Sequence, residues 1–338
     1  MEVYTATLPR IPVAVVGATG AVGQKAIALL EHHPRLKVTQ LVSSNAKTGR
    51  RYGEAVNWRE ELPLPNDVAD LILSSADEVT CPVAISALPA TVAETVELAL
   101  TERGIHVCSN AAAFRMDPTV PILIPEVNLE HLSLLSKQQH SGKLITNPNC
   151  VVAVLAPVLA PVLEITSVRH VSVITLQALS GAGYAGMDAL DGTATVIPCI
   201  EGEVEKIERE TRKILDCPDL PITTQVHRVP VRHGHMVAVQ VHYHTVVHPA
   251  EVVEAVRKQA ERYPHSYAMY SEPSLPQPVQ CLDDQDMRIH IGGIRQGGNG
   301  DTIAFVALGH NLVRGAAGAA IANLEAAIDA NILEVVQE

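Results

Sequence analysis

The sequence predicts an α/β protein of two domains, in which a parallel, doubly wound sheet is followed by a mixed α+β domain. Up to about residue 146, short apolar strands alternate with helices, which is typical of a parallel sheet with helices on both faces. After residue 150 the strands become longer and alternate apolar with polar residues, around one strongly charged helix. A chain of 338 residues also exceeds one comfortable core.

A glycine-containing turn joins the first strand to the first helix. An apolar strand over Ile11–Val16 leads into Gly17-Ala18-Thr19-Gly20-Ala21-Val22-Gly23, then a helix over residues 24–32 and a second strand over 37–42. Glycines at such a turn let the backbone approach a pyrophosphate closely at a helix N-terminus, where the dipole favours anions. We therefore predict a Rossmann-like dinucleotide site, although glycines that serve packing alone would give the same spacing.

The end of the second strand indicates which dinucleotide binds. A site for NAD usually has an acidic residue there, which holds the ribose 2′-hydroxyl. This chain instead has Ser43, Ser44 and, a little later, Arg50. Because hydroxyls and cations suit a 2′-phosphate, we predict NADP; a basic, solvated loop is the alternative.

The other predicted elements follow in chain order. Strands are expected at residues 83–89, 105–110, 143–146, 168–178 and 236–247, and helices at 92–103 and 203–215. Residues 311–318 lead into a last helix, rich in alanine and glycine, that runs through Ala330, and we expect it to pack back on the first domain.

Composition excludes several classes of function. The net charge of −12 argues against a nucleic acid or an anionic membrane as the main partner, because both require a basic face. The six cysteines form no CxxC pair, so neither a disulfide framework nor a thiolate zinc site is predicted. We see no signal peptide and no apolar run long enough to span a bilayer, and we expect a cytoplasmic protein.

The turn Asn147-Pro148-Asn149-Cys150 separates a strand from a long apolar run. If that run begins a helix, Cys150 lies at its N-terminus, where the thiol should ionise easily and act as a nucleophile. The alternative is a small buried residue without chemistry. Pro157 and Pro161 fall inside the run and predict a short or bent helix.

Residues 228–235 contain two arginines and two histidines, which can supply cations and a proton carrier for a thiol nucleophile. Chance adjacency is the alternative in a chain with 15 histidines. His242 and His244 have the spacing of a metal pair on a strand, but no third ligand is apparent, so we predict no metal.

Together these segments resemble the aspartate-β-semialdehyde dehydrogenase family, and most of all its archaeal and fungal branch. The resemblance spans nearly the whole chain and rests on residues 17–23 (GATGAVG), 109–117 (SNAAAFRMD), 124–128 (IPEVN), 147–150 (NPNC), 177–184 (QALSGAGY), 197–198 with 202–206, and 228–235 (RVPVRHGH). It implies a glyceraldehyde-phosphate-dehydrogenase-like fold. Residues 1–149 plus 311–338 would form the NADP-binding Rossmann domain, and 150–310 an α+β catalytic and dimerisation domain of a homodimer or homotetramer.

The resemblance also implies roles for individual residues. Cys150 would attack the acyl carbon, His235 would act as acid and base, and Gln177 would orient the acyl-enzyme. The other implied roles are substrate α-carboxylate binding by Arg228, substrate ammonium binding by Glu203, phosphate binding by Arg115, Lys206 and Asn149, and cofactor binding by Ser86, Gly181, Gly183 and Asn311. The residues themselves do not decide between Arg228 and Arg232 as the carboxylate ligand; only the family's spacing does.

The sequence also allows other functions and departs from the family pattern at some positions. A second hypothesis is a reductase of another activated acyl group, such as N-acetylglutamyl phosphate or malonyl-CoA, and a third is a non-catalytic dinucleotide-binding homologue. Val151 stands where the family usually has a small hydroxyl residue, so one hydrogen bond near the thiolate is expected to be absent. Thr195 replaces an asparagine of the related branch, and we attach no expectation to it.

Overall fold

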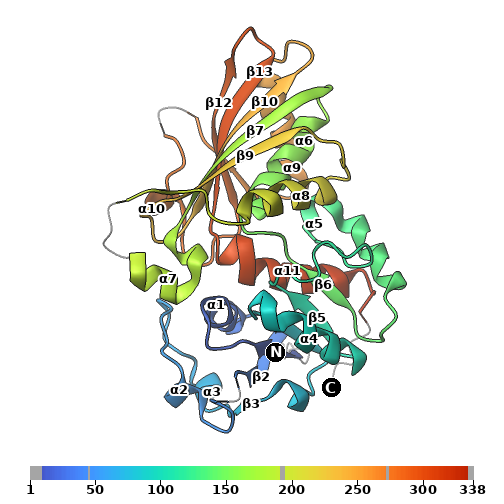
Figure 1. Cartoon of the computed structure of the whole chain (residues 1–338), viewed down its shortest axis with the longest axis vertical. Helices are drawn as coiled ribbons and strands as arrows, with labels where there is room; N and C mark the ends of the chain where they lie inside the picture. The colour runs from blue at the N-terminus through green and yellow to red at the C-terminus, as the bar shows by residue number, and fades with distance from the viewer. Residues whose placement is uncertain (1–9, 45, 191–194, 272–273, 334–338) are drawn as a thin grey trace, which may run out of the picture.

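The computed structural model describes residues 10–44, 46–190, 195–271 and 274–333. Two sheets dominate this part of the chain, one formed by the N-terminal half and one by the C-terminal half (Figure 1). Helix α11 (Gly318–Asp329) returns from the second sheet to lie beside the first (Figure 1).

The first sheet is parallel throughout and has the strand order β3-β2-β1-β4-β5-β6. This is the order of a Rossmann fold, whose ligands bind where the order reverses, between β1 and β4. Its elements are β1 (Ile11–Val16), α1 (Ala21–Leu30), β2 (Leu36–Val42), β3 (Leu73–Ser74), β4 (Val83–Ser86), α4 (Ala90–Glu102), β5 (His106–Ser109) and β6 (Leu144–Thr146).

The second sheet is mixed, with the order β11-β12-β13-β10-β7-β9-β8. Helices α6 (Val152–Leu163), α8 (Glu203–Ile214) and α9 (Pro249–Arg262) bury one of its faces (Figure 1). The strands are β7 (Val168–Gln177), β8 (Ile197–Pro198), β9 (Ile222–Arg228), β10 (His235–Tyr243), β11 (Tyr267–Met269), β12 (Ile289–Gly297) and β13 (Thr302–Gly309).

Short helices connect these elements. They are α2 (Tyr52–Ala55), α3 (Asn66–Ala69), η1 (Ala76–Glu78), α5 (Pro125–Asn128), η2 (Leu129–Lys137), η3 (Leu179–Ala182), α7 (Gly183–Leu190), α10 (Pro278–Cys281) and η4 (Val313–Ala317). The last of these is a π-helical turn that leads directly into α11. In the described part of the chain, every helix is too short or too polar to cross a membrane.

Helix α6 runs through both of its prolines over 12 residues, so of the two expectations, a short helix or a bent one, the first was wrong. Each proline lacks the N–H that would bond the carbonyl four residues earlier. Arg314 Nε instead donates to the Ala153 carbonyl, 3.2 Å away, and the Tyr267 hydroxyl donates to the Pro157 carbonyl, also at 3.2 Å. The carbonyls that Pro157 and Pro161 leave free are therefore bonded by side chains from other elements.

The predicted packing of the last helix is confirmed. Ala320, Leu324 and Ala327 of α11 lie in the same buried cluster as the apolar residues of β1, α1 and β2. The residues of α6 belong instead to the core under the second sheet. The start of α6 and the turn before it therefore lie where the two cores meet.

Candidate active site

Three neighbouring strands of the second sheet carry predicted catalytic and substrate-binding side chains at the same end of the sheet. Strand β7 ends at Gln177 and β9 ends at Arg228, and these two residues are register partners. Strand β10 begins at His235, and the next residue, Met236, lies opposite Leu176 on β7. Sheet register therefore brings together side chains that are 58 residues apart in sequence (177 to 235).

Cys150 lies in the turn between β6 and α6, as predicted. The Asn149 side chain accepts the N–H of Val151 at 2.9 Å, and the Asn149 backbone N–H donates to Glu210 Oε2 at 2.6 Å. On the other side, a Cβ at Gly315 would lie only 2.7 Å from the Cβ of Cys150. The π-helical turn η4 therefore packs directly against the nucleophile, and this position requires glycine.

The groups around Cys150 shift the pKa of its thiol in opposite directions. Burial raises the pKa of the thiol to about 12, and the neighbouring Glu203 carboxylate adds to this shift. Arg115, Arg228 and the Val151 N–H lower the pKa, but by less. The expectation of an easily ionised thiol was therefore wrong for this structure, because desolvation outweighs the helix N-terminus.

Glu203, the first residue of α8, connects several of the predicted side chains. Its Oε2 accepts a hydrogen bond from Asn149 Nδ2 at 2.8 Å and from Gln177 Nε2 at 3.4 Å. Its Oε1 pairs with Lys206 at 3.1 Å, and the Lys206 side chain is 45% exposed. Burial alone would raise the pKa of Glu203, but the Asn149 hydrogen bond and the Lys206 charge bring it below the ordinary value. The carboxylate is therefore ionised at neutral pH.

Arg228 and Arg232 have different environments. Arg228 is 9% exposed, donates from Nη1 to the Ala178 carbonyl at 2.7 Å, and is close enough to act on the charge of Cys150. Arg232 is exposed. The structure therefore favours Arg228 as the ligand of a buried anionic group. The sequence had not decided between Arg228 and Arg232, except through the spacing found in the family.

His235 is fully buried beside Gly181, whose missing side chain leaves room for the ring. Its Nδ1 accepts the N–H of Ala178 at 3.0 Å, so the neutral ring carries its proton on Nε2. Burial and the charge of Arg228 lower the pKa of His235 to about 3, which keeps the ring neutral. A Cβ at Gly181 would lie 2.7 Å from Arg228 Nη1 and 3.0 Å from His235 Cε1.

Asn311 is buried between two loops of the site. Its Oδ1 accepts the N–H of Gly234 at 2.9 Å, and its Nδ2 donates to Ser180 Oγ at 2.8 Å. Gly234 adopts a φ of 101°, which favours glycine. The Asn311 amide therefore fixes the segments that carry His235 and Gly181.

The glycine turn suits a dinucleotide. Gly17 has a φ of 88°, and a Cβ there would lie 2.7 Å from the Ala87 carbonyl oxygen, while a Cβ at Gly23 would overlap the carbonyl of Gly17. Gly20 has no such contact, since the nearest atom to its Cβ would be 3.5 Å away. No side chain caps α1 at Gly20, and the first turn, which contains Ala21 and Val22, has no acidic residue. The helix N-terminus thus faces the open side of the turn, as a pyrophosphate requires.

Asn311 apart, the other predicted cofactor residues lie with the glycine turn at the carboxyl end of the first sheet, with two exceptions. Ser86 is opposite Val16 at the β1/β4 switch point, and Ser43 follows β2. The exposed residues Ser44 and Arg50 come after Ser43, and Thr19 lies in the glycine turn. The exceptions are Gly183, which begins α7 with a φ of 70°, and Gly181 before it; both lie beyond the end of β7.

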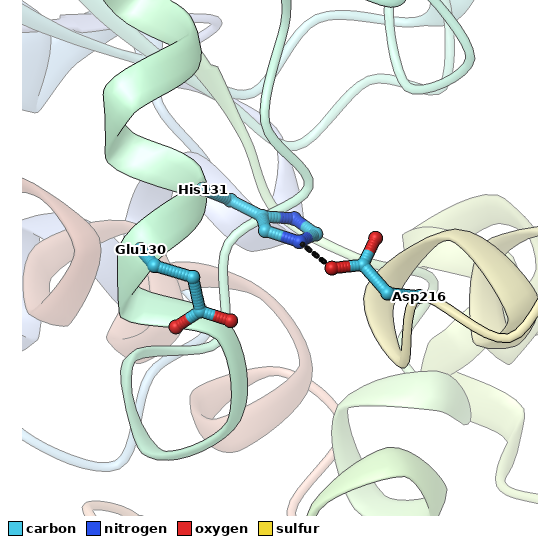
Figure 2. A group of neighbouring side chains, drawn as sticks. All are labelled: Glu130, His131 and Asp216. Carbon is cyan, nitrogen blue, oxygen red and sulfur yellow. Dashed lines mark hydrogen bonds and ion pairs between the residues drawn. The ribbon is translucent and has the colours of Figure 1, made fainter.

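Figure 2 shows Glu130, His131 and Asp216, whose ligand atoms lie within 4.8 Å of one another. The Asn128 amide donates to His131 Nδ1 at 2.9 Å, so the neutral ring has its proton on Nε2 and donates it to Asp216 Oδ2 at 3.0 Å. Both ring nitrogens are engaged, so this group is a hydrogen-bonded tie between η2 and the end of α8. His242 and His244, which were predicted to lie on one strand, do not share it, because β10 ends at Tyr243.

Two residues near the nucleophile were missed from sequence. Glu210 binds both Arg115 Nη1, at 2.9 Å, and the backbone of Asn149. Gly315 packs on Cys150. The first was detectable, because 203, 206 and 210 share one face of a helix. Of the two departures from the family pattern, Val151 is buried and donates its N–H to the Asn149 side chain. Thr195 is exposed, and nothing in the structure explains it.

Comparison with known proteins identifies the family. Residues 12–135 match the model of the semialdehyde dehydrogenase NAD-binding domain, and residues 200–314 match the semialdehyde dehydrogenase dimerisation domain. The aspartate-semialdehyde dehydrogenase of Archaeoglobus fulgidus is 39% identical over 96% of this chain and 100% of its own length. The chain belongs to the aspartate-semialdehyde dehydrogenase family.

Other members of the aspartate-semialdehyde dehydrogenase family agree. The enzyme of Schizosaccharomyces pombe is 33% identical and covers 95% of this chain and 99% of itself. The crystal structure of the Candida albicans enzyme with NADP has a TM-score of 0.85 at 29% identity, covering 95% of this chain and 99% of that one. The chain is accordingly an oxidoreductase with a nicotinamide dinucleotide cofactor and a dimerisation domain, on the predicted two-domain α/β fold.

Proposed function

We propose that the chain catalyses the reversible, phosphate-dependent oxidation of L-aspartate-β-semialdehyde by NADP, and that in the cell it reduces L-β-aspartyl phosphate. This reaction serves the biosynthesis of lysine through diaminopimelate, and of threonine and methionine. The named relatives support the substrate. The observation that carries the proposal is that Cys150 lies among Glu203, Arg115 and Arg228. One nucleophile is thus surrounded by a carboxylate for an ammonium group and cations for two anionic groups.

Cys150 divides the reduction into two easier steps. Its sulfur attacks the acyl carbon of the acyl phosphate, the bond from that carbon to the phosphate oxygen breaks, and phosphate leaves with the electron pair and the thiol proton. Bound NADPH supplies the hydride that reduces the resulting thioester to a hemithioacetal. The hemithioacetal then releases the aldehyde and returns the electron pair to sulfur, and one proton from water balances the hydride.

His235 is suited to stabilise negative charge at the substrate oxygen. Its Nε2–H is buried and has no hydrogen-bond partner among the described residues. We assign this N–H to a hydrogen bond with the developing alkoxide of the hemithioacetal; the ring stays neutral, and the oxygen loses its charge again as the aldehyde forms. Gln177, at the end of the neighbouring strand, orients the acyl group.

The substrate's charged groups find complementary side chains. Arg228 binds the α-carboxylate with the guanidinium nitrogens that do not contact Ala178, and Glu203 binds the ammonium. Phosphate lies among Arg115, Lys206 and Asn149. Arg115 is 7% exposed, and its Nε–H has no partner among the described residues, which leaves a buried donor for a phosphate oxygen.

The cofactor is NADP, held by the predicted glycine turn and by Ser43, Ser44 and Arg50. The fit rests on the uncapped N-terminus of α1 and the open side of Gly20. We assign residues 1–149 with 311–338 to the NADP domain and 150–310 to the catalytic and dimerisation domain. This division is supported by the two buried clusters, which take up α11 and α6 respectively.

We further propose a homodimer that forms through the open face of the second sheet. Ile174 on β7 is 43% exposed there, beside the part-exposed Ala238 and Val306. Ile174→Asp should raise the dimer dissociation constant at least about 100-fold, since a central apolar contact becomes a buried charge. Sedimentation equilibrium would measure this. Val279→Asp, which changes a 94% exposed residue on α10, should leave the dimer intact; a tetramer or an unchanged dimer in Ile174→Asp would contradict the assignment.

The cytoplasm is the compartment we assign to this enzyme. All six cysteines are unpaired in the structure, and a reducing compartment keeps them so. Loss of activity on oxidation, recovered by a thiol reductant, would support the assignment.

The proposed function is tested by following the nicotinamide absorbance band with L-aspartate-β-semialdehyde, NADP and phosphate. We expect NADPH to form only when phosphate is present, and at a higher kcat/KM with NADP than with NAD. Turnover without phosphate would rule out an acyl-phosphate product. If folded protein shows no turnover, activity with N-acetylglutamyl phosphate or malonyl-CoA would identify it as another acyl reductase, and inactivity with all of them would leave a non-catalytic homologue.

A further inference from the structure

Helix α8 carries four charged residues in one row, Glu203, Lys206, Glu210 and Lys213. Their spacing of three, four and three places them on one face of the helix. The first two belong to the proposed substrate site. The other two have no part in the proposed chemistry, but both contact Arg115, the proposed phosphate ligand.

Glu210 is 2% exposed and binds two parts of the site with its two oxygens. Its Oε1 accepts Arg115 Nη1 at 2.9 Å, and its Oε2 accepts the backbone N–H of Asn149 at 2.6 Å. Asn149 directly precedes Cys150. One buried carboxylate therefore connects the proposed phosphate ligand to the turn that holds the nucleophile.

Lys213 binds the backbone of the segment that carries Arg115. Its Nζ donates to the carbonyls of Arg115, Asp117 and Val120, at 2.7, 2.7 and 2.8 Å. An ammonium has three N–H donors, so these contacts use all of them. Lys213 therefore fixes the loop of residues 115–120, while Glu210 fixes the guanidinium at its start.

We propose that Glu210 and Lys213 are positioning residues that direct Arg115 at phosphate; this inference rests on the proposed function. The Arg115 guanidinium is planar, and two of its nitrogens are held, by Glu210 and by the Asn110 carbonyl at 2.8 Å. The direction of the third nitrogen, Nε, is then determined, and this is the buried N–H without a partner in the described residues. The first two residues of the row on α8 thus bind the substrate, and the last two orient Arg115, which binds phosphate.

The test is to compare Michaelis constants in Glu210→Gln. Glutamine preserves the side-chain volume but loses the charged bond to Arg115, so the KM for phosphate should rise about tenfold. The KM values for L-aspartate-β-semialdehyde and NADP should stay within about twofold, since neither ligand contacts Arg115 in the proposed mode. A uniform change in all three constants would indicate a merely structural role and overturn the inference.

Further variants keep the outcome interpretable. Lys213→Met should also raise the KM for phosphate selectively. It tests the same inference if Glu210→Gln does not fold. Glu205→Gln removes the same charge from an exposed residue of the same helix and should change none of the constants. If Arg115→Ala leaves the KM for phosphate unchanged, the proposed phosphate site is wrong. If Arg115→Ala raises that KM and both positioning variants leave it unchanged, only the present inference fails.

Discussion

Cys150→Ser is expected to lower kcat at least about ten-thousand-fold, as loss of an enzyme nucleophile does. The site already raises the pKa of the thiol to about 12 through burial and Glu203. A serine hydroxyl has a still higher pKa, so the attacking anion would be almost absent. Affinity for NADPH should not change, because the substitution exchanges one atom at the start of α6. Steady-state turnover together with NADPH fluorescence titration measures both quantities.

The matched control is Cys217→Ser, which makes the same exchange at a half-buried cysteine with no part in the proposed chemistry. It should retain turnover close to that of the unchanged enzyme. If Cys150→Ser also retained turnover within tenfold, no thioester could form and the proposed mechanism would be wrong. Acyl transfer from β-aspartyl phosphate, followed by mass spectrometry of the intact protein, should label the unchanged enzyme but not Cys150→Ser.

The first sheet was largely predictable because its signals are local. The strand over Ile11–Val16 has the bounds predicted for it, and the second strand differs by one residue. Helix α1 begins at Ala21, three residues before the prediction, because a start formed by glycine and small residues lacks a side-chain cap. Strands β3, β8, β9, β11, β12 and β13 were not predicted. Strand β9 pairs with β7, and β13 pairs with β10 as well as with β12 in a local hairpin, so most of their partners lie far away in the sequence. Strands β3, β8 and β11 have only two or three residues, too few to show an alternating pattern.

The candidate site was predictable in its residues but not in its electrostatics. The motifs named Cys150, Glu203, Arg115 and Arg228, and the structure brings all four together. The helix N-terminus predicted an acidic thiol, but the pKa depends on how much water is excluded, and that depends on packing between elements far apart in the chain. The contact of Glu210 illustrates the same limit: its helix face was detectable, but its partner Arg115 is 95 residues away.

The proline-containing helix that follows Cys150 depends on Arg314. This arginine is 4% exposed and pairs with Glu126 at 2.6 Å, while its Nε holds the carbonyl that Pro157 leaves free. Arg314→Met should lower the free energy of unfolding by about 3–5 kcal/mol, because it leaves a buried carboxylate unpaired. Urea unfolding at fixed protein concentration measures this. Arg257→Met, at an exposed ion pair on α9, is the control and should have a far smaller effect.

The loss in free energy of unfolding caused by Arg314→Met should depend on pH if it comes from the lost ion pair, and not if it comes from lost packing. Burial alone would raise the pKa of Glu126, but Arg314 and the hydrogen bonds from its neighbours lower it from 4.5 to about 2. The pair therefore stabilises the unchanged protein above pH 4.5 and loses that effect as the pH falls toward 2. In Arg314→Met, burial is unopposed by Arg314 and the pKa of Glu126 rises, so the folded state takes up a proton as the pH falls from neutral. The deficit should therefore be smaller at pH 5 than at pH 7; an equal deficit at both would mean that packing accounts for it.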